Sequence, residues 1–395
     1  MKKLIILFMA VFVLLSNVTS VSASPQNVSD VRSHPVIKEF NNLLQQDPIV
    51  RMYVTEMIDQ LPRGHKNVKD VDDFLCQLNQ ILTTAPKFSR GEVEVTPLSN
   101  LLVGMMNTPA GFHAFRNEKI NSMIRKILKT WEAFLNSGKS LYVLNDSPSG
   151  WKSKEAQKFL KMDDYLYDPK DKYWGYKSWN DFFTRKVKPS ARPISQPNND
   201  KIIVSPCDTT IFNISDNVQK VDKFWIKSQP YSLQDMLDNS QYVDEFVGGT
   251  VIQGFLSPFN YHRWNSPVSG TIVDAYVKDG LYFSQAESQG VDPSAQDKSQ
   301  GYLTHIQTRA FIYIKADDPI IGLMCFMPVG MVEVSSCIID PKIKPGYHVK
   351  KGEELGYFQY GGSTQCLIFR KGVIKKIIAE KNHFYKMGEE VAEAK

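Results

Sequence analysis

Residues 357–364 read Tyr-Phe-Gln-Tyr-Gly-Gly-Ser-Thr, a β-type run in which two glycines come directly before a serine. Glycine permits backbone geometry and close approach that other residues prevent. The hydroxyl of Ser363 can therefore attack the carbonyl of Gly362, provided that a base removes the hydroxyl proton. A β-bulge that only bends the strand explains the same pattern. The segment by itself leaves both interpretations open.

The C-terminal half of the chain surrounds this segment with short runs of β-type residues. The runs alternate with clusters of Gly, Pro, Asn and Asp, which is typical of strands joined by turns. They lie at residues 202–204, 250–255, 310–314, 331–338 and 365–369. We therefore predict a β-rich domain over residues 195–395.

The N-terminal part has a helical period instead. Between about residues 35 and 135, apolar residues recur every three or four positions, which predicts helices that bury one face. Asp47 before Pro48 is typical of an N-cap followed by the first helical position. The longest stripe begins at Asn117 and ends at residues 136–138, Asn-Ser-Gly, which are typical of a helix C-terminus. These stripes predict a packed helical core without chemistry of its own.

Together the two halves predict an α+β fold with two domains, since 395 residues exceed the length of one ordinary domain. Residues 24–140 form the expected helical domain, followed by the β-rich domain. Residues 141–194 are rich in Ser, Asp, Lys, Tyr and Pro without a sustained period. We expect this segment to be a linker on the surface that leads into the second domain.

The first 23 residues predict the compartment. Lys2 and Lys3 precede an apolar run at residues 4–15, and residues 21–23, Val-Ser-Ala, provide a small-residue cleavage site. This order is typical of a secretory signal peptide over residues 1–23, so we expect an exported protein, periplasmic or secreted. A retained membrane anchor is disfavoured, because the apolar run is shorter than the roughly 20 residues that span a bilayer.

Charge and cysteine content argue against several functions. The net charge is +5, of which the two lysines near the N-terminus contribute two. So small a surplus argues against a nucleic-acid binder and is compatible with peripheral contact to an anionic membrane. The cysteines show no metal-ligand spacing, so we predict no metal site. They are Cys76, Cys207, Cys325, Cys337 and Cys366.

Two further segments carry candidate catalytic side chains. His262 lies in a proline-bounded stretch after a predicted strand, where a turn would hold the imidazole at the edge of a sheet. Asp208 lies at a predicted strand-turn-strand junction. Each has a structural alternative, because a histidine in a turn is more often structural and an aspartate there usually caps its own backbone. An aspartate can also orient an imidazole, so Asp208, His262 and Ser363 would complete a set of acid, base and nucleophile.

Together these segments resemble the phosphatidylserine decarboxylase family. Its members carry Gly-Ser-Thr at a processing site, Tyr-His-Arg and Ser-Pro-x-Asp segments, a Phe-Phe-x-Arg-x-Leu-Lys-Pro-x-x-Arg-Pro motif and a characteristic approach to the processing site. Val187 replaces the leucine of the long motif. In chain order the matching segments lie at residues 182–193, 205–208, 261–263, 349–358 and 362–364. The resemblance covers about residues 175–375.

Two other segments, residues 47–52 and 329–337, resemble a soluble branch of this family that includes fungal L-tryptophan decarboxylase. Members of that branch act on free aromatic amino acids, whereas the substrate that names the family is a lipid. Two substrates therefore stay open, phosphatidylserine and a free aromatic amino acid such as tryptophan. The additional helical domain and the lack of a spanning segment favour the soluble substrate.

The resemblance implies a self-processing decarboxylase that depends on a pyruvoyl group. Ser363 would attack the Gly362 carbonyl, with His262 as base and Asp208 as its orienting acid, and the chain would be cut between these two residues. The smaller product, 33 residues long, would begin with a pyruvoyl group made from Ser363, which takes up the electrons released with carbon dioxide. His262 would then give a proton to the substrate carbon. No metal or external organic cofactor is implied; the processed chains would stay associated, and a homodimer is compatible with the family.

One position departs from the family pattern. Many members have a second histidine three residues after the Tyr-His-Arg histidine, where this chain has Asn265. Asparagine cannot act as a general base, so either His262 serves both steps or another histidine such as His305 takes one of them. Two other functions stay open. One is a non-catalytic exported binding protein that keeps the decarboxylase fold; the other is a serine hydrolase, which the missing Gly-x-Ser-x-Gly elbow disfavours.

Overall fold

The computed structural model describes residues 34–92, 94–222, 231–286, 292, 295–333, 336–360 and 363–395. The expected signal peptide therefore lies outside the described residues, as do Gly361 and Gly362. Helices come first in the chain and a strand-rich region follows, which confirms the predicted α+β fold.

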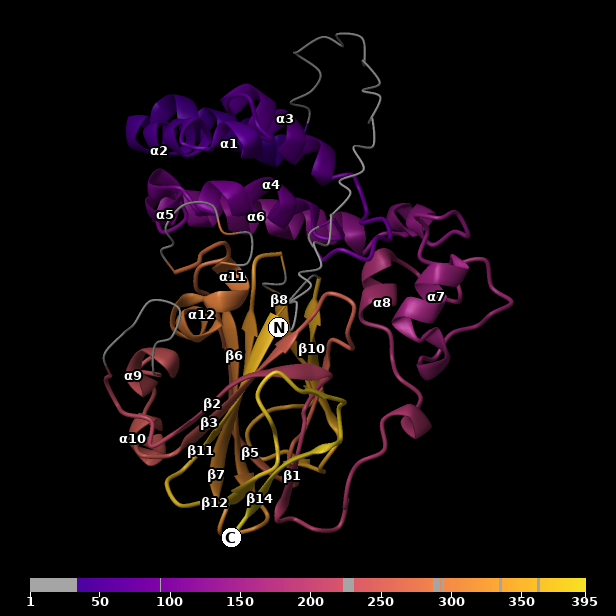
Figure 1. Cartoon of the computed structure of the whole chain (residues 1–395), viewed down its shortest axis with the longest axis vertical. Coiled ribbons are helices and arrows are strands. Elements are labelled where there is room, and N and C mark those ends of the chain that lie inside the picture. Colours follow the sequence, from indigo (N-terminus) through magenta and orange to yellow (C-terminus); the bar gives the residue numbers. More distant parts are fainter. Residues whose placement is uncertain are drawn as a thin grey trace, which may run out of the picture.

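The N-terminal helices form two layers above the end of a large sheet (Figure 1). The outer layer holds α1 (Pro35–Gln46), α2 (Pro48–Asp59) and α3 (Val71–Ile81), and the inner layer holds α4 (Pro97–Met106), α5 (Pro109–Ala114) and α6 (Glu118–Leu135). Asp47 caps α2 as predicted, since its Oδ1 accepts hydrogen bonds from the Ile49 and Val50 amides at 3.0 and 3.1 Å. Asn117 caps α6 in the same way.

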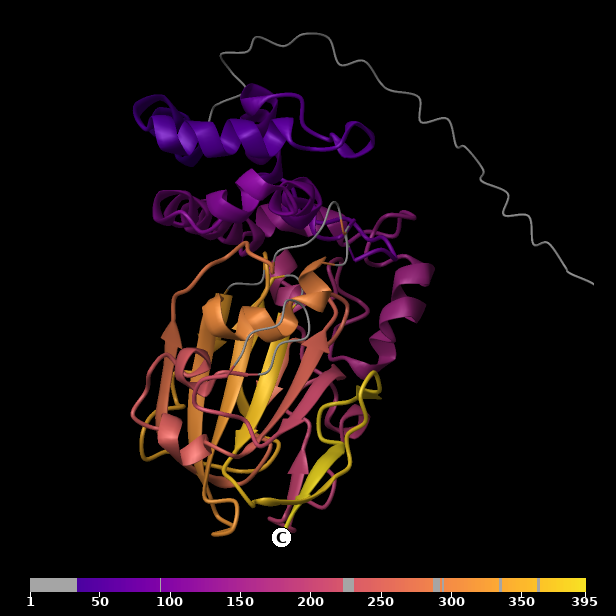
Figure 2. The ribbon, with the colours of Figure 1, turned by 60° about the vertical axis from the view of Figure 1, so that its left-hand side comes forward.

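Helices α4 and α5 lie inside the range that the sequence predicted to be helical, but neither was assigned individually. Helix α4 buries six of its ten residues, Leu98, Ser99, Leu101, Leu102, Met105 and Met106. It lies between the outer helices and the sheet domain (Figure 2).

The described strands form one large antiparallel sheet and two small ones. The large sheet runs β13 (Phe384–Tyr385), β2 (Thr209–Asp216), β3 (Thr250–Leu256), β11 (Ser363–Phe369), β7 (Leu323–Gly330), β6 (Arg309–Ala316), β5 (Gly270–Lys278) and β9 (His348–Val349). The small sheets run β1 (Ile202–Val204), β14 (Glu390–Ala394), β12 (Ile374–Ile377) and β4 (Arg263–Asn265), β10 (Glu354–Gln359), β8 (Ser336–Ile339). Strand β11 thus lies at the centre of the large sheet.

Most predicted strands are present, but several strands, among them β5, β12 and β14, were not predicted. The run at 331–338 is a strand only from Ser336 onward, and β7, which precedes it, was not predicted. Strand β7 is buried along almost its whole length. A strand that is covered on both faces does not alternate between apolar and polar residues, so its period is hidden.

Both faces of the sheet are covered. Cys366 and Ile368 of β11 face a cluster that includes the short helices α9 (Leu233–Met236) and α10 (Val243–Phe246). Leu367 and Phe369 face the opposite cluster, which contains Trp264 of β4 and Phe358 of β10. The helices α11 (Ala295–Lys298) and α12 (Gln300–Ile306) lie between the sheet and the N-terminal helices (Figure 1).

The expected surface linker is part of the packed structure. It contains α7 (Lys154–Leu160) and α8 (Trp179–Phe183), and it buries Trp151, Trp174 and Trp179. The rings of Trp151 and Trp179 lie 4.7 Å apart. Aromatic side chains at irregular spacing supply a large buried area without a helical or strand period, so the sequence pattern did not reveal this packing.

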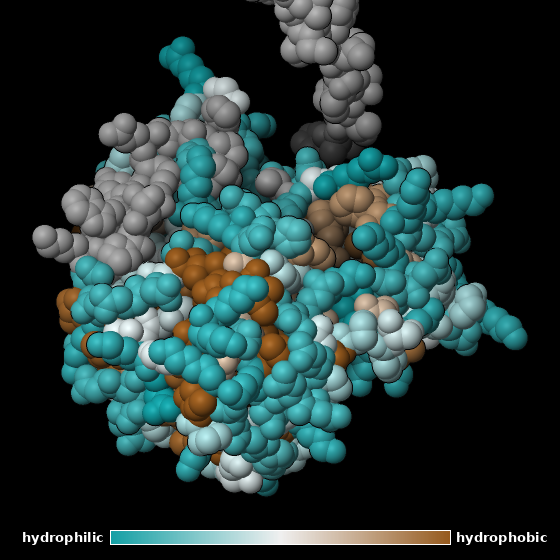
Figure 3. Space-filling view, turned by 60° about the horizontal axis from the view of Figure 1, so that its bottom comes forward, coloured by the Kyte–Doolittle hydropathy of each residue, from teal (hydrophilic) through white to brown (hydrophobic). Residues whose placement is uncertain are grey.

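The face at the sheet end of the molecule is mostly hydrophilic, with apolar side chains gathered near its centre (Figure 3). Among the described residues, no helix has the length and apolar character needed to cross a membrane. All of the cysteines are free thiols, and Cys325 is buried.

Candidate active site

Ser363 is the first residue of β11 and pairs with Leu256 of β3 and Gly330 of β7. Its side chain is fully buried, and its Oγ has no hydrogen-bond partner among the described residues. A buried hydroxyl without a partner costs roughly 1–3 kcal/mol of stability. A buried hydroxyl without a partner is unusual in a folded protein, and at the position of the predicted nucleophile it is what we expect of a reactive group.

The Ser363 side chain points to the side of the sheet that carries the predicted base. Successive side chains of a strand alternate between faces, so Ser363 shares a face with Leu367 and Phe369. That face is covered by the small sheet of β4 and β10. His262 directly precedes β4, and its backbone carbonyl accepts a hydrogen bond of 2.9 Å from the Phe358 amide of β10.

The His262 imidazole is buried and held in one tautomer. Its Nδ1 lies 2.9 Å from the carbonyl oxygen of Asn260. Because a carbonyl can only accept, Nδ1 carries the hydrogen and the neutral ring presents its lone pair at Nε2. The ring also packs against Phe183 at a centroid distance of 4.4 Å. Nε2 is therefore the atom that can act as a base.

Phe183 connects the base with the processing segment. Its ring lies 5.2 Å from that of Tyr360, which stands three residues before Ser363. His262 and Tyr360 thus contact the same aromatic ring. The fold brings two of the three predicted catalytic residues to one end of the sheet, although 101 positions separate them in the sequence.

Asp208 has a different partner from the one that the sequence suggested. Its carboxylate receives two hydrogen bonds from Arg192, Nε to Oδ1 at 2.8 Å and Nη2 to Oδ2 at 2.6 Å. The Met387 amide donates to the same Oδ1 at 2.9 Å. Arg192 in turn reaches Asp164 at 3.0 Å. Among the described residues, Nδ1 of His262 therefore contacts the Asn260 carbonyl, and the Asp208 carboxylate is bonded to Arg192.

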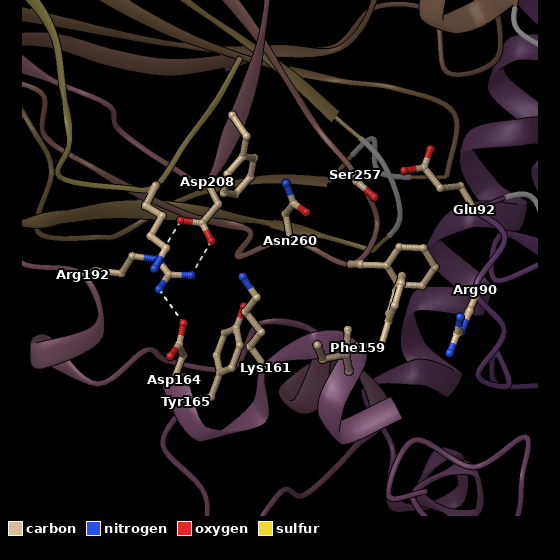
Figure 4. Close-up of a pocket in the computed structure, with 14 residues that line it drawn as sticks. Arg90, Glu92, Phe159, Lys161, Asp164, Tyr165, Arg192, Asp208, Ser257 and Asn260 are labelled. Atoms are coloured by element: carbon tan, nitrogen blue, oxygen red, sulfur yellow. Dashed lines mark hydrogen bonds and ion pairs between the residues drawn. The ribbon is translucent and has the colours of Figure 1, made fainter. Parts of the chain in front are cut away.

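A pocket of about 330 Å³ opens beside these groups. Arg192, Asp208, Asp164 and Lys161 lie at one end of it, and Figure 4 shows the ion pairs of Arg192 and the Lys161 side chain extending into the hollow. Phe159, Tyr165 and Phe259 supply aromatic walls. Ser257 and Asn260 line the pocket as well, and Ser257 directly follows Leu256, the strand partner of Ser363. Ser363 and His262 are not among the residues that line the pocket, and Ser257 and Asn260 are the lining residues that stand nearest to them in the chain and in strand pairing.

His305 was the alternative base, and its two ring nitrogens are bonded to backbone groups. Nδ1 lies 2.8 Å from the Gly301 carbonyl oxygen, and Nε2 accepts the Ser232 amide hydrogen at 3.1 Å. Burial lowers the pKa of His305 to about 4, so the ring is neutral at physiological pH. These contacts give His305 a structural position and favour His262 as the base.

Asn265, which replaces the second family histidine, also makes structural contacts. Its Nδ2 donates to the Gly352 carbonyl at 2.8 Å, and its backbone amide donates to the Pro206 carbonyl at 2.7 Å. The backbone bond connects β4 with the segment that leads into Asp208, and the side-chain bond connects β4 with the turn before β10. The side-chain amide of Asn265 therefore has a structural role in that turn.

Sequence reasoning assigned no role to several groups near the site. Asn260 and Phe183 position His262, and Arg192 holds Asp208. Phe183 and Arg192 do lie in the family motif at 182–193, but a motif match alone did not say what they touch. Glu333 was missed as well, and burial raises its pKa to about 8.

Comparison with known sequences identifies the family. The profile of phosphatidylserine decarboxylase matches residues 179–393, and a second profile of the same description matches residues 34–160. The chain belongs to the phosphatidylserine decarboxylase family. Its relatives are decarboxylases, so the protein is a carboxy-lyase.

Individual relatives support the soluble branch. The decarboxylase iboD of Amanita muscaria is 39% identical over 69% of this chain and 83% of its own length. The L-tryptophan decarboxylase of Psilocybe cubensis is 32% identical over 87% of this chain and 82% of its own length. Phosphatidylserine decarboxylase proenzyme 3 of Schizosaccharomyces pombe is 31% identical over 66% of this chain and 25% of its own length.

Proposed function

We propose that the chain cuts itself between Gly362 and Ser363, converts Ser363 into an N-terminal pyruvoyl group and removes the α-carboxylate of a free amino acid. The observation that carries this proposal is the buried Oγ of Ser363, which begins the central strand without a hydrogen-bond partner among the described residues. A purely structural serine at this position would be expected to satisfy its hydroxyl.

Self-cleavage needs a base, a nucleophile and a carbonyl. His262 Nε2 takes the proton of the Ser363 hydroxyl, and Oγ attacks the Gly362 carbonyl carbon. The peptide C–N bond breaks and the nitrogen of Ser363 gains a proton, so that an ester replaces the amide. Loss of the Ser363 α-proton then breaks the Cβ–Oγ bond of the ester by elimination, and Gly362 leaves as a carboxylate. Hydrolysis of the new terminus releases ammonia.

The site fits the pyruvoyl group. Ser363 lies in a buried strand end, where a carbonyl would be shielded from bulk water. The group supplies an electron sink for the electrons that remain when carbon dioxide leaves. Two residues of the chain supply the proton: His262 holds the proton that goes to the substrate carbon, and Asn260 keeps the His262 ring oriented.

The helical domain favours a free amino acid over a lipid. It covers the end of the sheet where β11 begins (Figure 2). Tyr360 donates a hydrogen bond from its hydroxyl to the Val95 carbonyl, and its ring lies 5.0 Å from that of Trp131 on α6. The pocket with its aromatic walls is large enough for an amino acid with an aromatic side chain. The names of the fungal relatives agree with this choice.

The decisive measurement is the intact mass of the purified protein under denaturing conditions. We expect two chains, of which the smaller has 33 residues and the mass of a pyruvoyl terminus. The Ser363→Ala variant should stay uncut and inactive. A wild-type chain that remains uncut, or a Ser363→Ala protein that still releases carbon dioxide, would contradict the proposal. Assays with tryptophan and with phosphatidylserine vesicles then separate the two substrates.

The same mass spectrum tests the proposed export. A large chain that begins at Ser24 would show removal of residues 1–23. A large chain that begins at Met1 would contradict a cleaved signal peptide.

A further inference from the structure

Glu333 is a buried carboxyl group for which the decarboxylation chemistry has no use. It is 5% exposed and follows the last residue of β7 by three positions. Its Oε1 accepts hydrogen bonds from the amides of Leu98 and Ser99, the latter at 3.2 Å. Glu333 therefore caps the N-terminus of α4, where two backbone amides would otherwise lack partners.

This cap belongs to a closed ring of contacts around the processing position. Glu333 holds the beginning of α4, and the segment directly before α4 contains Val95, whose carbonyl accepts the Tyr360 hydroxyl. Tyr360 stands three residues before Ser363, and Ser363 pairs with Gly330 at the end of β7. From Gly330 the chain returns to Glu333. Tyr360 and Ser363, the described residues on either side of Gly361 and Gly362, are thus both anchored.

The two anchors are adjacent in space. Glu333 and Tyr360 line the same small cavity of about 20 Å³. The Tyr360 ring is further fixed by Trp179 at 5.8 Å and Phe183 at 5.2 Å. Movement of the α4 N-terminus would therefore release the Tyr360 hydroxyl and let the processing segment shift relative to β11.

We propose that Glu333 is a positioning residue for self-cleavage, which fastens the N-terminal helical domain to the segment that carries the cut. The inference rests on the proposed self-cleavage and extends it. The helical domain would then be needed for processing as well as for covering the site. A nucleophile and a carbonyl react fast only when they are held in near-attack geometry, and a displacement of about 1 Å costs roughly 100-fold in rate.

The test follows cleavage over time after cell-free synthesis of the full chain, by gel and intact mass. Glu333→Ala removes the cap, and Tyr360→Phe removes only the hydroxyl that reaches Val95. We expect both variants to be cut about 10- to 100-fold more slowly than the wild type. Glu333→Gln keeps a carbonyl oxygen that can accept both amides, so it should be cut within about twofold of the wild-type rate.

A matched control separates positioning from general loss of stability. Phe74 of α3 is buried against Phe40 in the outer helical layer. Phe74→Leu should lower the unfolding temperature without slowing the cut. If Glu333→Ala does not fold, Tyr360→Phe decides the question, since it keeps the ring contacts.

The inference is overturned if folded Glu333→Ala and Tyr360→Phe proteins are cut at the wild-type rate. It is also overturned if Phe74→Leu is slowed as much as Glu333→Ala, or if Glu333→Gln is as slow as Glu333→Ala. A wild-type chain that is never cut would instead overturn the proposed function itself, and the two failures are therefore distinguishable.

Discussion

The Nδ1 atom of His262 lies 2.9 Å from the backbone carbonyl oxygen of Asn260. In the serine-histidine-aspartate arrangement a carboxylate occupies this place and stabilises the charged imidazolium. A neutral carbonyl fixes the same tautomer with less stabilisation of the positive charge. The ring is thereby suited to take a proton in one step and to release it in another, which is what a single histidine must do if it serves both processing and decarboxylation.

Replacement of His262 tests this double role. His262→Ala should slow self-cleavage by about 10²- to 10⁴-fold, because the Ser363 hydroxyl loses its base. Time-resolved intact mass after synthesis gives the rate. His348→Ala is the matched control, since His348 is exposed and pairs with Asp317 on the surface. If both variants are cut at the wild-type rate, His262 is not the base.

Arg192 should be important for stability because it neutralises Asp208 in the interior. Removing one partner of a buried ion pair leaves an uncompensated charge and costs about 3–5 kcal/mol. We therefore expect Arg192→Met to lower the free energy of unfolding by this amount. Arg192→Lys should recover only part of the loss, since an ammonium cannot form the two parallel bonds of a guanidinium.

Urea unfolding measures both Arg192 variants. Lys375→Met provides the control, because the pair of Lys375 with Glu393 is largely exposed and should contribute at most about 1 kcal/mol. Equal losses in the free energy of unfolding for Arg192→Met and Lys375→Met would show that the buried ion pair contributes no more to stability than the exposed pair.

Glu333 predicts a specific dependence of stability on pH. Burial raises its pKa from 4.5 to about 8, so the folded protein keeps a proton that the unfolded chain has lost between these values. Proton release on unfolding lowers the free energy of unfolding as pH rises, by at most about 1.4 kcal/mol per pH unit. Glu333→Gln cannot titrate and should lack this contribution.

The measurement compares urea unfolding of the wild type and Glu333→Gln from pH 5 to pH 9. The difference in stability should grow in favour of Glu333→Gln up to about pH 8 and then stay constant. Parallel curves over the whole range would mean that the carboxyl titrates alike in the folded and unfolded states.

Local sequence patterns predicted those parts of the fold that local physics controls. The N-cap at Asp47 and the start of a helix at Asn117 could be predicted, because an N-cap bonds to amides only two or three residues away. The strand that begins at Ser363 could be read from its β-type residues. Strand β7 was not predicted, because a strand that is covered on both faces does not alternate between apolar and polar residues.

The order of residues along the chain predicts which groups are present for the chemistry: Ser363 after its glycines, His262 in its proline-bounded turn and Asp208 at its junction. The contacts that these groups make could be found only in the folded protein. Asp208 meets Arg192, His262 meets Asn260, and Glu333 caps a helix that lies 235 positions away in the chain. Contacts of this kind depend on how helices and sheets pack against one another, and no local preference of the backbone encodes that packing.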